Sequence, residues 1–219
     1  MKDYFISDTH FGHKNVIRYC NRPFKTVTEM NETIVSRWNN IVSDGDRVFV
    51  IGDVFLMSPL DAKPIIESLN GYKILIAGNH DRSKKTMLAA GFDEYHKSYD
   101  YSTNKFEKVL LNHYPVPDII LRDGGYAFQI HGHIHSPPIV RGLKINVAVD
   151  LIDFKPIDID HILQLRGCIS DTSKDELFEA KVNDGRLLIN MNIATEDFSG
   201  ASSRIYDIIR EQCLENTRK

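Results

Sequence analysis

The sequence predicts an α/β fold in which two β-sheets form a sandwich and helices flank it. Over residues 1–91, short apolar runs alternate with helical patterns. This alternation is typical of a parallel sheet that is covered on both faces. From residue 109 onward, short strand-like runs follow one another with few helices between them, which predicts a second sheet.

Length and composition indicate an ordinary globular protein. The 219 residues suffice for one domain and an appendage, and 42% hydrophobic and 26% charged residues are usual values. The net charge of −3 weighs against a broad phosphate-binding surface, and a processive nuclease would need a basic stripe with interleaved aromatic residues. The composition does not exclude a small binding site for nucleic acid. Three cysteines without a pairing motif do not support a disulfide framework.

Two features predict where the protein is located. A strand-like run begins within the first residues, which leaves no space for a signal peptide. Every apolar stretch is shorter than the ~18 residues that a membrane helix needs. We therefore expect a cytoplasmic protein with no membrane partner.

Three buried strands are predicted in the first half, and each is followed by a helix. Thr26 and Glu29 have capping-box spacing, and apolar residues including Trp38 continue from there at helical intervals. Trp38 is therefore expected in the core. The predicted strands are 4–6, 47–51 and 73–77, and the predicted helices begin at Thr26, near residue 60 and at Ser83.

The second half is less regular. Residues 95–108 are polar and are predicted as a loop or an edge strand, and strands at 109–111, 126–130 and 144–150 and a helix at 158–165 follow. Asp184-Gly185 then gives a strong hairpin signal, and a short amphipathic helix follows at 205–213. We divide the chain into a domain over residues 1–165 and a C-terminal extension over 166–219. The extension either packs on the core or contacts a second copy in a homodimer.

A polar cluster follows each of five predicted strands. In extended backbone the side chains of His133 and His135 point the same way, and Gly132, directly before them, would let the chain bend there. Any one cluster could be a solvated loop or a polar turn. Together they supply about the number of oxygen and nitrogen donors that two divalent ions need, at the strand ends where α/β sheets bind ligands. The clusters contain Asp8, His10, Asp53, Asn79, His80, His113, His133 and His135.

The order of these clusters resembles a known family. Over residues 3–165, the pattern Asp-x-His, Gly-Asp, Gly-Asn-His-Asp, His and Gly-His-x-His is similar to that of the calcineurin-like metallophosphoesterase superfamily. The phrases Ser-Asp-Thr-His-Phe-Gly-His and Asn-Val-Ala-Val-Asp look most like its small bacterial and phage members. Two departures are mild. Asp53 is followed by Val54-Phe55-Leu56 rather than by a second Asp or Gly, and residues 166–219 exceed the smallest members.

The resemblance implies a centre with two divalent metal ions. Manganese is the expected metal, with iron, zinc or nickel as alternatives. The ions would lie ~3.5–4 Å apart, and a hydroxide that bridges them would attack phosphorus. His131 falls outside the implied ligand set, and we interpret it as a packed residue or one that orients a ligand. The implied ligands are Asp8, His10 and His135 for one ion, Asn79, His113 and His133 for the other, and Asp53 as the bridge.

Four residues near this centre carry further expectations. His80 is expected to donate a proton to the leaving oxygen, and Asp81 either orients His80 or caps a helix. Arg22 is expected to bind phosphate, with a solvated surface arginine as the alternative. His13 is expected either to touch the substrate or to make a structural hydrogen bond.

The predicted activity is metal-dependent hydrolysis of phosphate esters. A phosphodiester or nucleotide is the favoured substrate, and Tyr114 would flank its base or pack on the core. A phosphomonoesterase is the nearest alternative. A metal-binding scaffold without turnover is the second alternative, but such a protein should lack ligands or His80, and this sequence has them all.

Overall fold

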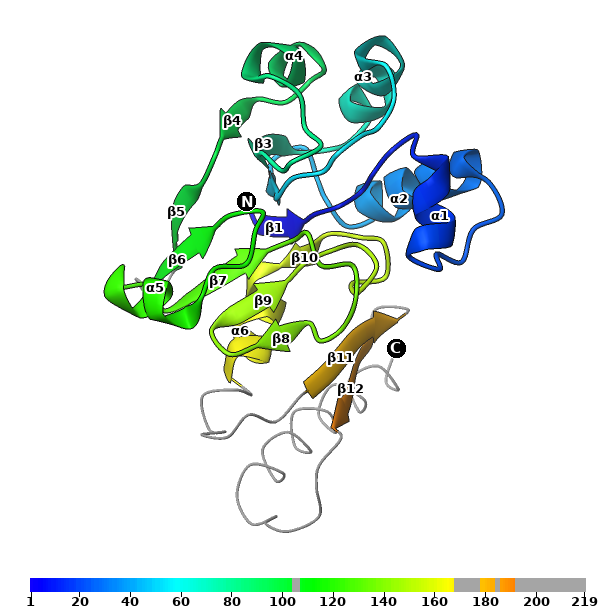
Figure 1. Cartoon of the computed structure of the whole chain (residues 1–219). Helices are drawn as coiled ribbons and strands as arrows, with labels where there is room; N and C mark the ends of the chain where they lie inside the picture. Colours follow the sequence, from blue (N-terminus) through cyan, green and yellow to red (C-terminus); the bar gives the residue numbers. More distant parts are fainter. Residues whose placement is uncertain (104–106, 168–177, 184–185, 192–219) are drawn as a thin grey trace.

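The computed structural model describes residues 1–103, 107–167, 178–183 and 186–191, and it contains two sheets (Figure 1). The first sheet has the strand order β10-β1-β2-β3-β4. Strands β1 to β4 are parallel, and β10 is antiparallel to β1. The strands of this sheet are β1 (Asp3–Ile6), β2 (Arg47–Val50), β3 (Tyr72–Ile76), β4 (Glu94–His96) and β10 (Ile157–Asp158).

The second sheet has the order β12-β11-β8-β9-β7-β6-β5. Strands β6, β7 and β9 are parallel neighbours, and the other neighbouring pairs are antiparallel. The predicted two-sheet α/β fold is therefore confirmed. The strands of this sheet are β5 (Tyr99–Ser102), β6 (Lys108–Leu111), β7 (Phe128–His131), β8 (Val140–Arg141), β9 (Lys144–Asn146), β11 (Phe178–Asn183) and β12 (Arg186–Met191).

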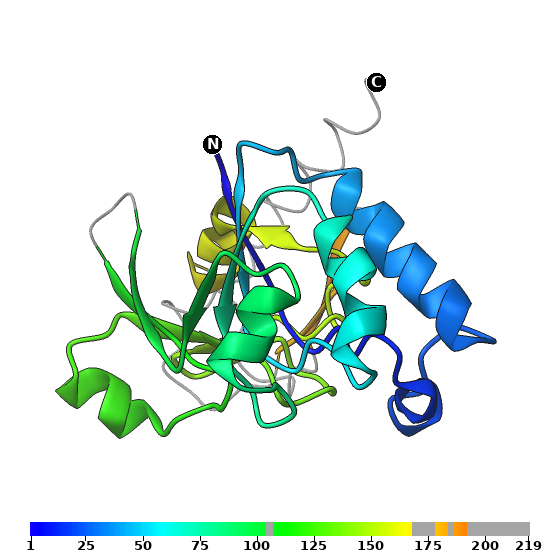
Figure 2. The same cartoon turned by 90° about the horizontal axis from the view of Figure 1, so that it is seen from above.

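Helices flank both sheets. Thr26, Ser58 and Ser83 cap α2, α3 and α4, because each side-chain oxygen accepts a backbone N–H from three residues later. The predicted helix starts at Thr26 and Ser83 are confirmed, whereas α1 and α5 were not predicted. Both views place α5 at the opposite end of the molecule from α1 and α2 (Figures 1 and 2). The helices are α1 (Lys14–Tyr19), α2 (Val27–Asn39), α3 (Pro59–Glu67), α4 (Lys84–Ala89), α5 (Asp118–Asp123) and α6 (Ile159–Gly167).

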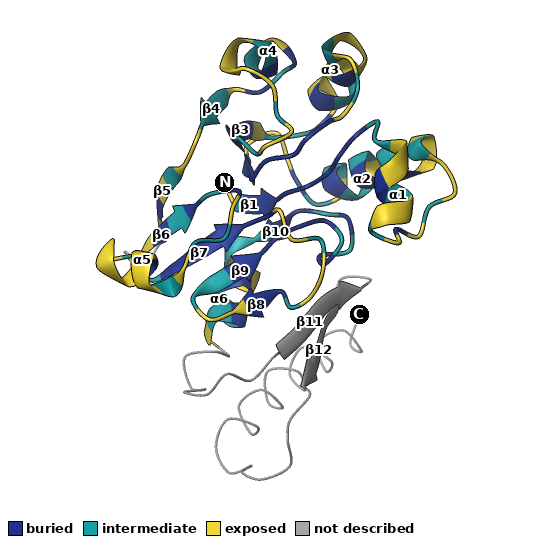
Figure 3. Ribbon diagram, viewed as in Figure 1, coloured by how far each residue is buried: buried dark blue, intermediate teal, exposed yellow. Residues whose placement is uncertain are grey.

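The two sheets share one apolar core. Phe5 of β1 and Phe49 of β2 stack with their ring centroids 5.2 Å apart, and Tyr101 of β5 lies edge-on against both at 5.3 Å. Trp38 of α2 is fully buried, as its place in the helical pattern predicted. Figure 3 shows buried residues concentrated in the strands and exposed residues on the outer faces of the helices.

The run 144–150 serves both sheets instead of forming the single strand that we predicted. Strand β9 ends at Asn146, where the side-chain oxygen accepts the N–H of Ala148 and turns the backbone. Beyond this turn, Ser7 N donates to Val147 O at 2.9 Å, and Val149 N donates to Ser7 O at 3.1 Å. The run therefore crosses to the carboxyl end of β1 and brings the ends of the two sheets together.

The C-terminal strands agree with the predicted hairpin. Strand β11 pairs with β12 in antiparallel register and joins the second sheet through β8. The turn at 184–185 and the helix predicted at 205–213 lie outside the described residues. The domain boundary at residue 165 and the homodimer stay predictions. No helix in the described part of the chain is both long and apolar enough to cross a bilayer.

Candidate metal centre

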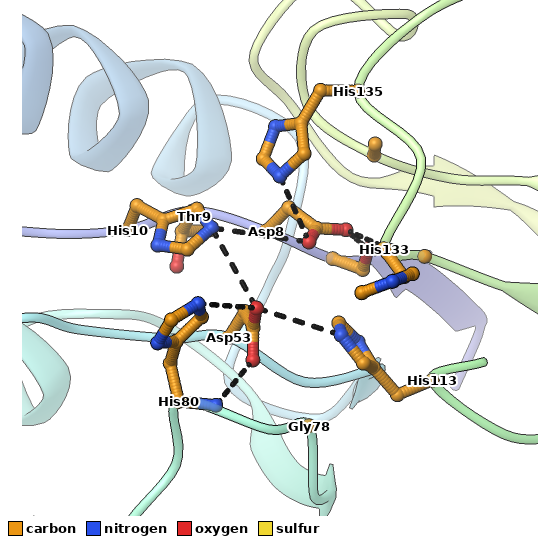
Figure 4. A network of polar contacts seen from close by, with 12 residues as sticks. Asp8, Thr9, His10, Asp53, Gly78, His80, His113, His133 and His135 are labelled. Atoms are coloured by element: carbon orange, nitrogen blue, oxygen red, sulfur yellow. Dashed lines mark hydrogen bonds and ion pairs between the residues drawn. The ribbon is translucent and has the colours of Figure 1, made fainter. Parts of the chain in front are cut away.

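The carboxyl ends of strands from both sheets meet at one site (Figure 4). Strands β1, β2 and β3 of the first sheet lead into it, and strands β6 and β7 of the second sheet enter it from the other side. The structure thus brings together the eight residues of the predicted clusters. They are Asp8, His10, Asp53, Asn79, His80, His113, His133 and His135.

Four of these residues have a left-handed backbone conformation. The φ angle is 58° at Asp8, 50° at His10, 58° at Asp53 and 70° at His133. Residues other than glycine seldom adopt such angles, which cost about 1–3 kcal/mol each. Backbone bonds hold the turns in place, since Asp8 N donates to Gly52 O at 3.0 Å and His10 N donates to Asp53 O at 3.1 Å. The fold therefore stores strain at the positions whose side chains meet.

Two glycines allow close packing behind the site. A Cβ at Gly78 would lie 2.8 Å from the backbone nitrogen of Asp53 and would also collide with its Oδ1. A Cβ at Gly132 would lie 2.8 Å from Cβ of Ser7 and would collide with Oδ2 of Asp8. Gly132 does not have a positive φ. Gly132 therefore leaves the space that Ser7 and Asp8 occupy, and the backbone bends here as expected, since Ile134 N donates to Gly132 O at 2.8 Å.

Asp8, His10 and His135 form the more buried group of donors. Nε2 of His135 lies 3.3 Å from Oδ1 of Asp8, and Nε2 of His10 lies 3.9 Å from the same oxygen. The side chain of Asp8 is fully buried, and those of His10 and His135 are 5% and 22% exposed. Burial lowers the pKa of His10 to about 4, which favours the neutral imidazole that metal ions bind. These three residues are the set predicted for one ion.

Asp53 lies between this group and the second one. Its Oδ1 accepts the backbone N–H of His80 at 2.9 Å. Its Oδ2 lies 3.5, 3.8 and 3.9 Å from Nε2 of His113, His10 and His80. Burial raises the pKa of Asp53, but the bonds with His113 and with the N–H of His80 outweigh this effect and lower it to about 2. At neutral pH an ionised oxygen therefore faces three imidazoles.

Asn79, His113 and His133 form the more open group. Oδ1 of Asn79 lies 3.1 Å from Nε2 of His113. His113 is buried, whereas Asn79 and His133 are exposed. The ring of His133 lies 5.2 Å from that of His113, and the backbone N–H of His133 donates to Oδ2 of Asp8 at 3.0 Å. Within the described ranges, the close cluster of donors on this side is Asp8, Asp53 and His113, with His133 beside it.

The orientation of His113 fits a cation. Its Nδ1 lies 2.9 Å from Ile51 O, so the N–H at Nδ1 donates there. In the neutral ring, Nε2 then presents a lone pair to Asn79 Oδ1 and Asp53 Oδ2, which are also acceptors. Burial lowers the pKa of His113, but the bonds with Asp53 and Ile51 and the charge of Asp8 together outweigh burial and raise the pKa, so a proton and a metal ion compete for Nε2.

The first group fits a cation for the same reason. Nδ1 of His135 donates to Oδ2 of Asp150 at 2.8 Å, which turns Nε2 toward Oδ1 of Asp8. This oxygen and Nδ1 of His10 are buried and have no hydrogen-bond partner in the parts of the chain that the structure describes. Burial lowers the pKa of His135, but its bonds with Asp150 and Asp8 outweigh burial and raise the pKa to about 12, so either a proton or a metal ion lies between Nε2 of His135 and Oδ1 of Asp8.

Comparison with known proteins decides the family. The sequence model of the calcineurin-like phosphoesterases matches residues 1–176. The chain belongs to this family. Calcineurin-like phosphoesterases hydrolyse phosphate esters with metal ions, so the predicted superfamily and enzyme class are confirmed.

Three proteins show the range of its relatives. The uncharacterized protein MJ1445 of Methanocaldococcus jannaschii is 39% identical, over 75% of this chain and 90% of its own. The Gene 66 protein of Mycobacterium phage L5 is 29% identical, over 67% of this chain and 86% of its own. The crystal structure of AQ665, a protein of unknown function from Aquifex aeolicus, superimposes with a TM-score of 0.63 at 28% identity. That superposition covers 75% of this chain and 98% of AQ665.

Asp81 supports this calcineurin-like phosphoesterase site in a way that we did not predict. Its Oδ2 accepts the N–H groups of Asp53 at 2.9 Å and Gly78 at 2.8 Å, and its Oδ1 accepts the N–H that follows Asp53 at 2.9 Å. Ser83 rather than Asp81 caps α4. Asp81 therefore fixes the loop that carries Asp53, in place of the expected role as a helix cap or a partner of His80.

Arg22 is buried and bonded within the protein, which contradicts the alternative of a solvated surface arginine and leaves no exposed guanidinium for a phosphate. Its side chain is fully buried, and Nε and Nη2 donate to the two oxygens of Asp150 at 2.8 and 2.9 Å. Nη2 also donates to Asp8 O at 2.8 Å. Asp150 was missed as a site residue, although it ends the run 144–150 as the other polar clusters end their strands.

The remaining predicted neighbours of the phosphoesterase site are resolved in part. The ring of His13 lies 5.5 Å from that of His10, and its role toward substrate stays a prediction. Tyr114 is 46% exposed and its ring lies 4.8 Å from that of His133, so it is not a core residue. His131 is buried with Nδ1 2.7 Å from Gly132 O, as a packed residue would be.

Proposed function

We propose that this phosphoesterase binds two divalent ions and hydrolyses phosphodiesters or nucleotides, with manganese as the preferred metal. The observation that carries the proposal is the position of Asp53. Its Oδ2 lies 3.8 Å from His10 in one group of donors and 3.5 Å from His113 in the other. A carboxylate in this position can serve both ions.

In this proposal, the more buried group of donors holds one ion and the more open group holds the other. When bound, the ions would activate water at neutral pH and neutralise charge on the phosphoryl group. Carboxylate and amide oxygens favour manganese, while the imidazoles also suit iron, zinc or nickel. The proposed ligands are Asp8, His10 and His135 for the first ion, Asn79, His113 and His133 for the second, and Asp53 for both.

His80 is proposed to donate a proton to the leaving oxygen. Its side chain is 49% exposed, which leaves the ring accessible to a substrate. Its backbone N–H is tied to Asp53, and its Nε2 lies 3.9 Å from the same carboxylate, so the ring stays at the site. A positioned general acid of this kind typically contributes ~10²–10⁴-fold to the rate.

Charge and exposed surface favour a diester or nucleotide substrate. A phosphate monoester carries about −1.5 to −2 charges at neutral pH, whereas a diester carries only one. The cation expected from Arg22 is committed to Asp150, which removes one partner for the additional charge of a monoester. The exposed ring of Tyr114 beside His133 offers a surface on which a nucleoside could stack.

Two chromogenic esters test this proposal. Purified protein would be loaded with Mn²⁺, its metal content measured, and its rates on bis-p-nitrophenyl phosphate and p-nitrophenyl phosphate compared. We expect two ions per chain and faster cleavage of the diester. Faster cleavage of the monoester would establish a phosphomonoesterase instead. A folded, metal-loaded protein that cleaves neither ester would favour the scaffold.

A further inference from the structure

A chain of buried polar contacts runs from Arg22 through Asp150 to the proposed ligand His135. Both oxygens of Asp150 are held by Arg22, at 2.8 Å from Nε and 2.9 Å from Nη2. The Oδ2 that bonds Nη2 also accepts Nδ1–H of His135 at 2.8 Å. The side chain of Arg22 is fully buried and that of Asp150 is 6% exposed, so water competes little with these bonds.

This arrangement determines which nitrogen His135 offers to a metal ion. The hydrogen-bond partner of one imidazole nitrogen sets the tautomer and leaves the other nitrogen to bind metal. Asp150 takes the Nδ1–H, so Nε2 is the nitrogen that points to Oδ1 of Asp8, at 3.3 Å. The planar guanidinium grips both oxygens of Asp150 and fixes the plane of the carboxylate.

The same guanidinium also holds the backbone at another proposed ligand. Nη2 of Arg22 donates to Asp8 O at 2.8 Å, and Nη1 donates to Thr9 O at 3.1 Å. Asp8 has a φ of 58°, a strained angle that persists only where its surroundings enforce it. One side chain thus supports both the backbone of Asp8 and, through Asp150, the imidazole of His135.

We propose that Arg22 and Asp150 are positioning residues that preorganise Asp8 and His135 as ligands of the first ion. The inference rests on the proposed two-ion site. It assigns to Arg22 a task on the protein side of the metal centre, away from the phosphate. Outer partners of metal ligands usually contribute 10–100-fold to metal affinity, and this range sets the expected effect.

The position of Arg22 itself is fixed by the connection between α1 and α2. Its N–H donates to Ile17 O of α1 at 2.8 Å, and its guanidinium lies over the ring of Phe154 at 5.7 Å. The ring of Phe24 packs on the same Phe154 ring at 4.8 Å. These contacts join the connection between α1 and α2 to the turn that follows Asp150.

A neighbouring ion pair provides a control, with Arg37 36% exposed where Arg22 is fully buried. Arg37 of α2 donates to Asp153 O at 2.7 Å and also bonds the Asp153 carboxylate. This pair joins the helical layer to the same turn as Arg22 does, but its bonds go to Asp153 rather than to a proposed ligand. A purely structural contribution would appear in both pairs, and a positioning role only in the Arg22 pair.

Binding of Mn²⁺ to metal-free protein, followed through the signal of free Mn²⁺ in electron paramagnetic resonance, tests the proposal. Arg22→Lys keeps the positive charge but loses the planar guanidinium that bonds both oxygens of Asp150. Asp150→Asn leaves a single oxygen to accept from both Arg22 and His135. We expect each variant to bind the first ion 10–100-fold more weakly than wild type. Arg37→Lys should bind both ions with wild-type affinity.

Two results would overturn the proposal. One is unchanged affinity in both variants, and the other is an equal loss of affinity in Arg37→Lys. A further measurement uses wild-type protein and needs no variant. In wild-type protein loaded with Zn²⁺, ¹⁵N spectra should show a proton on Nδ1 and metal on Nε2 of His135, and the reverse assignment would contradict it. If wild-type protein binds two ions but cleaves neither ester, the proposed function is overturned and this inference is not. The Mn²⁺ affinities of the variants can still be measured in that case.

Discussion

The two groups of donors differ in how the protein supports them. Asp8 is fully buried, and His135 is held through Asp150 by the buried Arg22. On the other side, Asn79 and His133 are exposed, and the ring beside His133 belongs to the half-exposed Tyr114. Ligands that are held in place before binding lose little freedom when the ion arrives, whereas exposed ligands must first be ordered. We therefore expect the first ion to bind tightly and the second to exchange more readily next to the substrate.

The largest effect should come from Asp53, which connects the two groups. Asp53→Asn removes the charge of the oxygen that faces both, so metal content should fall and activity should drop by ~10³-fold or more. The stability of the metal-free protein to urea should change little, because the amide can still accept the N–H of His80. Asp44→Asn alters an exposed carboxylate before β2 and serves as the control. Wild-type turnover in Asp53→Asn would refute the shared ligand.

His80 belongs to neither group, and its removal should separate binding from chemistry. In His80→Ala we expect both ions to stay bound while kcat falls by ~10²–10⁴-fold, since a general acid is lost. Metal content and steady-state rates measure the two effects. His96→Ala removes a histidine that pairs with Glu94 at 2.7 Å, and it should leave both unchanged. An unaltered kcat in His80→Ala would exclude His80 from the reaction.

A stepwise Mn²⁺ titration tests the comparison between the groups directly. Wild-type protein should bind two ions with affinities that differ by roughly tenfold or more, as buried and exposed ligand sets imply. Asn79→Ala should lower the affinity for the second, weakly bound ion only. His135→Ala should abolish binding of the first, tightly bound ion. If the assignments are exchanged, the buried group is not the tighter site.

The smallest effect should come from the packing behind Asp53. A Cβ at Gly78 would lie 2.8 Å from Asp53 N and 3.0 Å from Cε1 of His113, so Gly78→Ala should cost about 1–3 kcal/mol of stability. Gly45→Ala is the control, because a Cβ there meets nothing within 4 Å among the described residues. Urea unfolding of both variants measures the difference. Equal stability would show that the loop around Gly78 adapts.

Much of the site was predictable because its donors follow a simple rule. Parallel strands end at a common edge, so polar residues just after strands 4–6, 47–51 and 73–77 must come close together. The second sheet obeys the same rule after β6 and β7. For this reason the pattern of residue types along the chain is enough to locate the centre.

The errors concern residues whose role depends on distant partners. Arg22 is separated from Asp150 by 128 residues, and their contact depends on how the run 144–150 crosses between the sheets. Asp81 looked like a helix cap from its neighbours, but its three N–H partners include one at Asp53. Helices α1 and α5 were missed because each has only 6 residues, too few for a clear apolar periodicity, and neither has a side-chain cap such as Ser83, which revealed the equally short α4.

The left-handed conformations at Asp8, His10, Asp53 and His133 place donors that the activity needs, but they lower the thermal stability of the protein. Glycine would relieve the strain at each position, at the expense of a donor. At Asp8 and Asp53 glycine would also remove the acceptors of the N–H groups of His133 and His80, so of these four positions only His10 and His133 should gain stability from glycine once metal is no longer needed. Directed evolution that selects only for thermal stability should therefore yield proteins that have lost activity. A screen that also measures ester cleavage should find its stabilising mutations at other positions in the chain.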